Sequence, residues 1–461
     1  MKRILALALF VATPLAAHVG DINSYFDGLA GPYPIRVIVR PPGVVPGRAE
    51  ITVRTSASDV TQVMVKPVRW DAREGTGGSP PADTAKPVGG ERGLYAAELW
   101  LMANGSYSIY VDVVGARGHG RAIVPITNIA TKRLPMPKAL GVVLAILGVI
   151  LVAGAVSIVG AGVREAVVRP GVEASPQNRR RARITMAIAA VLFFLLVARG
   201  NAWWNNVDAR YRKSMFRPFA VKTSATGGQL TLTIDDDRWQ NARTASWTAL
   251  LPDHGKLMHL FLIGERGELA HLHPVSVTRE RFRANLPPLP PGRYRLFADI
   301  THESGFAQTL VDTVTIGNVP PVPPTDPDDS WTHPSSASLV MQPAKLVAGR
   351  DADLRFDVRD ASGQPVAPEP YIGMAGHAVI AAEDFSVFVH VHPNGTISMA
   401  SQQRFLERDG IVDHSMHMQQ ANAATTIAFP YAFPKPGRYR VWVQAKVAGE
   451  IVTRMFDVTV S

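Results

Sequence analysis

Six histidines in two similar sets are the residues of this chain best placed to do chemistry. In each set, a single histidine on an apolar run is followed, after a short polar break, by a His-x-His-Pro motif. The first set is His259, His271 and His273, and the second is His377, His390 and His392. Residues i and i+2 of a β-strand point to the same face, so the two imidazoles of each motif share a face. Because neutral imidazole is a common metal ligand, the pattern predicts metal binding.

The segments between the histidines predict two β-hairpins. If 265–267 form the first turn and 384–385 the second, the single histidine of each set lies directly opposite the last histidine of its motif. Directly opposed residues have Cβ atoms about 4.5–5.5 Å apart, which is close enough for three imidazoles to reach one ion. We therefore expect a three-histidine site in each hairpin, near the surface of its own sheet.

Further candidate ligands extend both sites. In the first, His302 is a candidate fourth ligand, although an ordinary loop residue fits the sequence equally well. His254 belongs to the same candidate set, and Met258 is expected to face the core. The second site is joined by a loop rich in ligands, which contains His414, Met416, His417 and Met418. The two sites are therefore not expected to be copies of each other.

The ligand types favour copper. The chain has no cysteine, so a metal ion has only histidine, carboxylate or methionine available to it. Thioethers favour Cu(I), and imidazole accepts either oxidation state of copper. Zinc more often recruits cysteine or a carboxylate beside its histidines, and it stays open as the alternative. The competing interpretation is that the motifs are partly exposed histidines ahead of a proline turn, and that the methionines fill an apolar gap in a surface loop.

The N-terminal residues predict export. Residues 1–17 combine Lys2 and Arg3 with an apolar run and small residues at its end, which is typical of a secretory signal peptide. Cleavage after Ala17 would leave His18 at the mature N-terminus. An exported protein without cysteine has no disulfide bonds, so its domains must be held together by hydrophobic cores.

Two further apolar runs predict a transmembrane helical hairpin at 138–204. The run 140–163 is uncharged and exceeds the roughly 20 residues that a bilayer requires. The run 184–197 is shorter, and it continues to a pair of tryptophans suited to a membrane interface. The segment between them carries six arginines and two glutamates, which the positive-inside rule places in the cytoplasm. The rest of the chain is then expected on the extracytoplasmic side of the inner (cytoplasmic) membrane.

Three related β-domains are expected outside the hairpin. A Gly-x-Tyr sequence enters an alternating strand at Tyr107, Tyr294 and Tyr439, and a turn and a second alternating strand follow each time. Short alternating strands broken by proline and glycine predict antiparallel β-sandwiches. The expected domains are domain one (18–130), domain two (214–318) and domain three (330–461). The stretch 318–329 is expected to be a solvated linker, and the pair Asp328-Asp329 a surface turn.

With these features, the chain resembles bacterial membrane-anchored periplasmic proteins whose immunoglobulin-like domains bind metals, of the YtkA/FixH-like or copper-resistance type. The resemblance rests on the signal peptide, the anchored β-sandwiches, the His-x-His-Pro motifs and methionine next to histidine. It covers domains two and three better than domain one. It implies three immunoglobulin-like domains that handle copper, and in the copper-resistance type an N-terminal histidine binds the ion, a role that His18 would fill.

The leading hypothesis is an inner-membrane-anchored periplasmic protein that binds copper for storage, delivery or tolerance, with a periplasmic or membrane metal-handling protein as its partner. The alternative is a structural protein whose immunoglobulin-like modules organise partners at the membrane, with histidines that are incidental or pH-responsive. A third hypothesis is an oxidative copper enzyme built on His18. No nucleophile elbow, phosphate-binding glycine loop or zinc-protease helix motif occurs, so we expect no enzyme. The net charge of +10 reflects the arginine-rich segment, so we expect no nucleic-acid partner.

Overall fold

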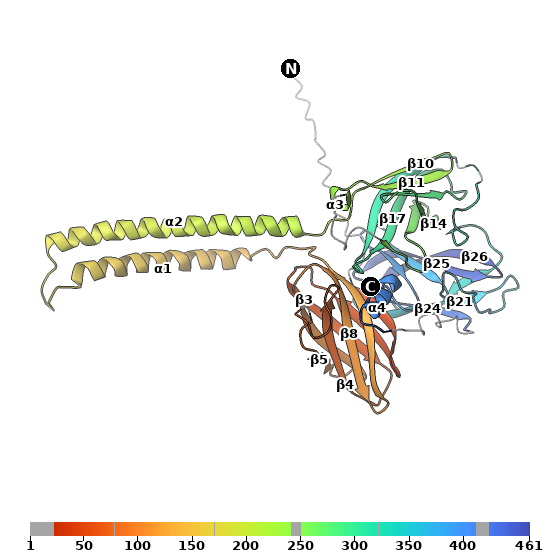
Figure 1. Cartoon of the computed structure of the whole chain (residues 1–461), viewed down its shortest axis with the longest axis horizontal. Helices are drawn as coiled ribbons and strands as arrows, with labels where there is room; N and C mark the ends of the chain where they lie inside the picture. Colours follow the sequence, from red (N-terminus) through yellow and green to blue (C-terminus); the bar gives the residue numbers. More distant parts are fainter. Residues whose placement is uncertain are drawn as a thin grey trace, which may run out of the picture. The chain divides into compact units, whose positions relative to one another are not determined.

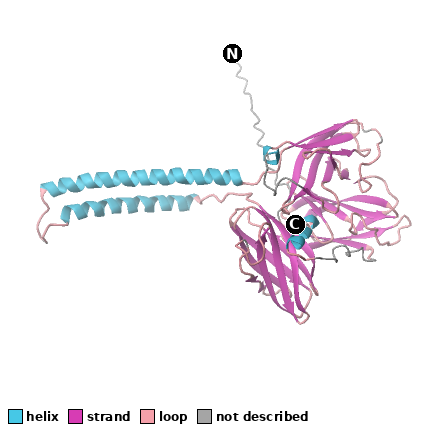
Figure 2. Ribbon diagram, in the orientation of Figure 1, coloured by secondary structure: helices cyan, strands magenta, loops and turns pink. Residues whose placement is uncertain are grey.

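The structure is a computed structural model that describes residues 23–77, 79–169, 171–240, 250–318, 320, 322–411 and 424–461. The chain forms two compact units, 130–216 and the remainder. The fold is mainly β, as the sequence predicts, with several antiparallel sheets and two long apolar helices (Figure 2). The expected signal peptide at 1–17, His18, and the loop residues His414, Met416, His417 and Met418 lie outside the described residues.

The unit at 130–216 contains two long helices, α1 (Lys138–Glu165) and α2 (Pro176–Ser214), which lie side by side (Figure 1). The Ser175 hydroxyl caps α2 by accepting a hydrogen bond from the Asn178 N–H. By length and composition, both helices are able to cross a membrane. Helix α2 continues to Ser214 rather than ending at 204, because its polar last turns remain helical and include an i, i+4 ion pair between Asp208 and Arg212.

Domain one is a sandwich of two antiparallel sheets around one hydrophobic core. The first sheet has the order β1 (Ser24–Ala30), β2 (Tyr33–Arg40), β3 (Gly47–Thr55), β7 (Leu94–Leu101) and β6 (Lys86–Pro87). The second has the order β5 (Asp83–Thr84), β4 (Val60–Arg69), β8 (Gly105–Gly115) and β9 (Gly118–Asn128). Along β3 every second residue is buried, which is the alternation that the sequence predicts for a half-buried strand.

Domain two also pairs two antiparallel sheets around a core. The outer sheet has the order β10 (Val221–Thr226), β11 (Gln229–Ile234), β16 (Arg281–Asn285) and β15 (Val275–Ser276). The inner sheet has the order β12 (Leu250–Leu251), β17 (Gly292–His302), β13 (His259–Gly264), β14 (Leu269–Leu272) and β19 (Ser330–Trp331), with β18 (Ala307–Ile316) also paired to β17. A single turn of helix, α3 (Asp237–Gln240), follows β11.

Domain three repeats the plan. Its outer sheet has the order β20 (Ser338–Met341), β21 (Ala352–Arg359) and β24 (Thr426–Tyr431). Its inner sheet has the order β23 (Phe388–Val391), β22 (His377–Ala382), β25 (Gly437–Val447) and β26 (Glu450–Val460). Helix α4 (Met399–Arg408) follows β23, and the Ser398 hydroxyl caps it. The likeness of these sandwiches to immunoglobulin domains stays a prediction.

The internal repeat that the sequence predicts is visible in one hydrogen bond made three times. The hydroxyls of Tyr107, Tyr294 and Tyr439 each donate to the carbonyl four residues upstream, at distances of 3.2, 2.7 and 2.8 Å. A tyrosine that bonds back to the preceding turn fixes the entry of its strand into the sheet. The three domains therefore share a local device that the Gly-x-Tyr spacing reveals.

The inner sheets of domains two and three pack against each other. Every residue of β13 and of β22 is buried, so these strands have no solvent-facing side. One face of each sheet lines its own core, and the other joins an apolar layer formed by both domains. In this layer Phe297 stacks on Phe388 with ring centroids 4.0 Å apart, and the Trp442 indole N–H donates to the Gly267 carbonyl at 2.8 Å. We call this contact the inter-sheet layer.

Candidate metal centre

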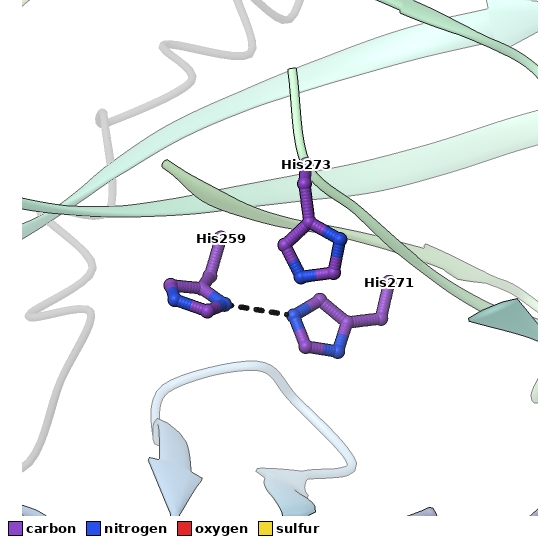
Figure 3. Close-up of side chains that lie close together, drawn as sticks. All are labelled: His259, His271 and His273. Carbon is purple, nitrogen blue, oxygen red and sulfur yellow. Dashed lines mark hydrogen bonds between the residues drawn. The ribbon is translucent and has the colours of Figure 1, made fainter. Parts of the chain in front are cut away.

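The first histidine set forms a compact triad on the hairpin β13–β14 (Figure 3). The ladder pairs Leu260 with Leu272, and the same register sets His259 opposite His273. The turn is closed by the Gly264 N–H bonding to the Glu268 carbonyl, so its three loop residues are the predicted 265–267. The predicted hairpin is therefore confirmed. One nitrogen from each of the three histidines lies within 4.8 Å of the others.

The second set forms an equivalent triad on β22–β23. Ala378 pairs with Val391, so the register sets His377 opposite His392, as predicted for a turn centred on 384–385. The turn residue Phe385 has a left-handed backbone with φ of 55°. One ring nitrogen from each of His377, His390 and His392 lies within 4.8 Å of the others.

The two triads lie together at one end of the inter-sheet layer. The ring centroid of His390 is 5.4 Å from that of His259 and 5.6 Å from that of His271, and His271 is 6.1 Å from His377. Five of the six imidazoles are at most 4% exposed, and the His390 side chain is 7% exposed. The two sets form two triads, but the expectation that they lie near the sheet surfaces is wrong, because each sheet covers the histidine face of the other.

The outward nitrogens of most of these histidines are held by oxygen acceptors. The Nε2 atoms of His259 and His377 are each 3.1 Å from a backbone carbonyl, of Asp253 and Tyr371 respectively. His273 Nδ1 is 3.1 Å from an oxygen of Asp329. Such contacts fix the tautomer and leave the other ring nitrogen with a free lone pair. The inward nitrogens of these three histidines are thus available to an ion.

The remaining acceptors cross between the domains. His271 Nδ1 of domain two is 3.0 Å from the Gln444 side-chain oxygen of domain three. His390 Nδ1 of domain three is 3.6 Å from a carboxylate oxygen of Asp299 in domain two, which is an ion-pair contact rather than a hydrogen bond. The two acceptors occupy equivalent positions, since β17 pairs Asp299 with His259 and β25 pairs Gln444 with His377. Each domain therefore places a polar side chain beside a histidine of the other, with a hydrogen bond at His271.

Burial favours the neutral form of five of the six triad histidines. Desolvation lowers the pKa well below its usual value, and neighbouring imidazoles lower it further, for His259, His271, His377, His390 and His392. Desolvation also raises the pKa of Asp299 to about 7. Neutral imidazoles are the form that binds metal, so these five histidines need no deprotonation at neutral pH.

The spacing of the triads suits a metal ion. The His259 Nδ1 to His271 Nε2 distance and the His377 Nδ1 to His390 Nε2 distance are both 3.1 Å. Two nitrogens bound to one tetrahedral ion at about 2.0 Å are about 3.3 Å apart, so these pairs nearly have the required spacing. The third nitrogen of each triad would move inward by about 1.5 Å at most, given the same bond length.

The structure does not bring His302 to the first triad. His259 is opposite Asp299 in the ladder, and His302 is three residues beyond Asp299, so its side chain points to the opposite face of the sheet. Its ring packs beside Phe219 and Trp239 in the core of domain two. The expectation that His302 is a ligand of this site is corrected, whereas the expectation that Met258 faces the core is confirmed.

The segment before domain three is also more structured than expected. The Asp329 side chain is 1% exposed, because it accepts hydrogen bonds from the backbone and the ring of His273. Strand β19 at 330–331 then adds to the inner sheet of domain two beside β14. The expectation of a solvated linker ending in a surface turn is therefore wrong at Asp329. The sequence holds no local signal that this carboxylate meets a histidine 56 residues earlier.

Comparison with known proteins supplies a family match without a function. Residues 219–317 and 335–461, which lie in domains two and three, match a family described as "Domain of unknown function (DUF8832)". No curated protein matches the chain.

Solved structures add no further argument. Escherichia coli alpha-2-macroglobulin activated by porcine elastase is 8% identical, with 93% of this chain and 33% of that chain covered and a TM-score of 0.16. The N-terminal periplasmic domain of ScsB from Proteus mirabilis is 9% identical, with 65% and 100% covered and a TM-score of 0.16. The chain thus spans about a third of the length of the first structure.

Proposed function

We propose that this chain is a membrane-anchored metal-binding protein that holds one ion at each histidine triad, for storage, delivery or tolerance of the metal. The observation that carries the proposal is the orientation of the imidazoles. Four of the six have the outward nitrogen within hydrogen-bond distance of an oxygen, and His390 has it 3.6 Å from one. In all five the inward nitrogen is directed at the cluster. Histidines that bind metals in proteins are held in this way.

Buried nitrogens without hydrogen bonds support metal binding over a purely structural cluster. Within the described part of the chain, His273 Nε2 has no hydrogen-bond partner, and neither ring nitrogen of His392 makes a well-formed hydrogen bond. Each such buried group costs about 1–3 kcal/mol. A bound ion would accept the free lone pairs and remove this cost.

Copper is the ion that we propose, with zinc as its competitor. The described donors are imidazoles, which suit both metals. Preference for copper rests on the thioethers of Met416 and Met418 and on the resemblance to copper-handling domains, since soft sulfur ligands favour Cu(I). Zinc sites with histidine more often include cysteine or a carboxylate.

The proposed location is the inner membrane, with the β-domains on its extracytoplasmic side. Helices α1 and α2 are able to span the bilayer. The residues between the apolar segments are rich in arginine, and such segments remain in the cytoplasm. A periplasmic or membrane metal-handling protein is the partner that this location suggests.

Metal analysis of the full chain in detergent tests the proposal. The wild type, loaded separately with Cu(I), Cu(II) and Zn(II), should retain two ions per chain. His271→Ala and His390→Ala should each lower the affinity for one ion by more than about 100-fold. The loss of a ligand should exceed the roughly 10–100-fold effect of removing a supporting residue. His119→Ala is the matched control, since His119 lies on domain one with an exposed side chain. A wild type that retains no ion would contradict the proposal and favour a pH-responsive structural role.

A further inference from the structure

His254 of domain two is directed at the triad of domain three. Its ring centroid is 5.0 Å from that of His392 and 5.8 Å from that of His377, but 6.3 Å from that of His259 in its own domain. Two imidazoles on one tetrahedral ion, with bonds of about 2.0 Å, have ring centroids about 5 Å apart. The distance between His254 and His392 therefore matches a shared ion.

The His254 side chain has the features of a ligand. It is only 10% exposed, and its Nε2 atom is buried without a hydrogen bond from any described residue. The nearest carboxylate oxygen, of Asp253, is 3.7 Å away, which is too far for a hydrogen bond. A buried imidazole with a free nitrogen therefore faces the second triad.

The equivalent position in domain three cannot act in the same way. The loops before β13 and β22 have the same backbone: His254 and Gly255 have φ values of 50° and 80°, and Ile372 and Gly373 have 49° and 76°. In both loops the preceding carbonyl bonds to the single histidine of the triad. The duplicated loop thus offers an imidazole in domain two and a hydrocarbon in domain three.

We propose that His254 is the fourth ligand of the domain-three site, so that the two ions of the centre are not equivalent. This inference rests on the proposed function and extends it. The domain-three ion would be closed in by four imidazoles from two domains, whereas the domain-two ion would have three imidazoles and an open position. Four protein ligands are typical of a permanently held ion, and three with an open position are typical of an exchangeable or ligand-accepting one.

Two consequences follow from the shared ligand. The closed ion joins the loop of domain two to β22–β23 of domain three, so its binding stabilises the contact between the domains. The open ion is the one available for transfer to a partner or for binding a small anion or water. The cluster would then combine an ion that holds the structure with an ion that exchanges.

Competition titration of the full chain in detergent with Zn(II) and a chromophoric chelator tests this assignment. The wild type should show two affinities. His254→Asn removes the imidazole and keeps a residue that tolerates positive φ. This change should weaken the tighter site at least about 10-fold, with the weaker site unchanged, since losing a ligand should cost no less than losing a supporting residue. His119→Asn, on the surface of domain one, is the control for the substitution itself.

A reciprocal variant keeps the test decisive. Ile372→His should add an imidazole at the equivalent position, tighten the weaker site, and bring the two affinities together. Two ions bound by His254→Asn with unchanged affinities would overturn the inference while leaving the proposed function intact. Equal weakening of both sites would overturn it too, because His254 would then act through the shared fold. A wild type that binds no zinc or copper would instead overturn the proposed function.

Discussion

The triads of domains two and three have the same backbone and the same ligands but different surroundings. Both have a single histidine held by a loop carbonyl and a His-x-His pair on the next strand. They differ at Asp299 against Gln444 and at His254 against Ile372. Among the described triad histidines, His273 has a carboxylate oxygen within hydrogen-bond distance of its ring, whereas the carboxylate beside His390 is 3.6 Å away. Both triads retain the features that position three imidazoles. They differ in the residues around the ligands, which adjust the affinity for a bound ion. The comparison indicates duplication followed by specialisation of the supporting residues.

Lowering the pH should protonate the histidines of both triads and destabilise the fold, and this is the largest effect that we expect. A histidine with a pKa lowered by folding contributes stability that is complete above its unfolded pKa of about 6.5 and is lost as pH falls toward the folded pKa. Seven histidines have lowered pKa values: His254, His259, His271, His302, His377, His390 and His392. Each contributes up to about 1.4 kcal/mol per pH unit.

The pH dependence of the Asp299 carboxyl group offsets that of one of these histidines. Its raised pKa means that the folded state takes up a proton near pH 7, so this carboxyl group favours folding as pH falls. Among the described residues, Asp253, Asp326 and Asp329 also face histidines of the cluster. The net result is that metal-free protein should lose most of a typical 5–15 kcal/mol of stability between pH 6.5 and 5. Urea unfolding with a chelator at both values measures this loss, and an unchanged midpoint would contradict the neutral buried cluster.

Removing the acceptors that cross between the domains should sharpen the comparison. Gln444→Leu should weaken the domain-two ion, and Asp299→Leu should weaken the domain-three ion, each by about 10–100-fold as for other residues that support a ligand. Each change should leave the other ion within about threefold. Zinc competition titrations measure both affinities. The affinity that His254→Asn weakens is the one assigned to the domain-three ion. An effect of each variant on the ion of its own domain would show that the crossed contacts do not support the ligands.

The apolar end of the inter-sheet layer should show the smallest effect. Trp442→Phe removes the hydrogen bond to the Gly267 carbonyl and leaves some space, which should lower the free energy of unfolding by about 1–2 kcal/mol. Metal affinity should change little, because the substitution leaves every candidate ligand in place. Trp100→Phe is the control, since Trp100 is 59% exposed on domain one. Thermal unfolding and zinc titration of both variants test the separation, and a large loss of metal affinity in Trp442→Phe would contradict it.

The sequence predicted each triad because a hairpin is a local structure. The spacing between His259 and His273 places a three-residue turn between them, and the period of two in a strand decides which side chains share a face. The same period explains the error at His302. The strand that enters at Tyr294 is present as β17, but it extends to His302, and its register against His259 depends on residues 40 positions away.

The meeting of the two triads depends on contacts between domains, which no local pattern specifies. One signal was nevertheless present. The strands 259–264 and 377–382 are apolar at nearly every position, which is typical of strands buried on both faces. Histidines on such a strand have no access to solvent, and a second covering layer was therefore required. The identity of the covering layer, the inner sheet of the other domain, follows only from the packing of Phe297, Phe388 and Trp442.

The central claim is that six histidines from two domains form one centre for two neighbouring ions. Electron paramagnetic resonance of the full chain loaded with two equivalents of Cu(II) tests it most directly. Ions in adjacent triads should give a dipole-coupled pair with a half-field transition, and His390→Ala should convert it to the signal of an isolated ion. Two uncoupled signals, or a single tightly bound ion that survives in both His271→Ala and His390→Ala, would contradict the account.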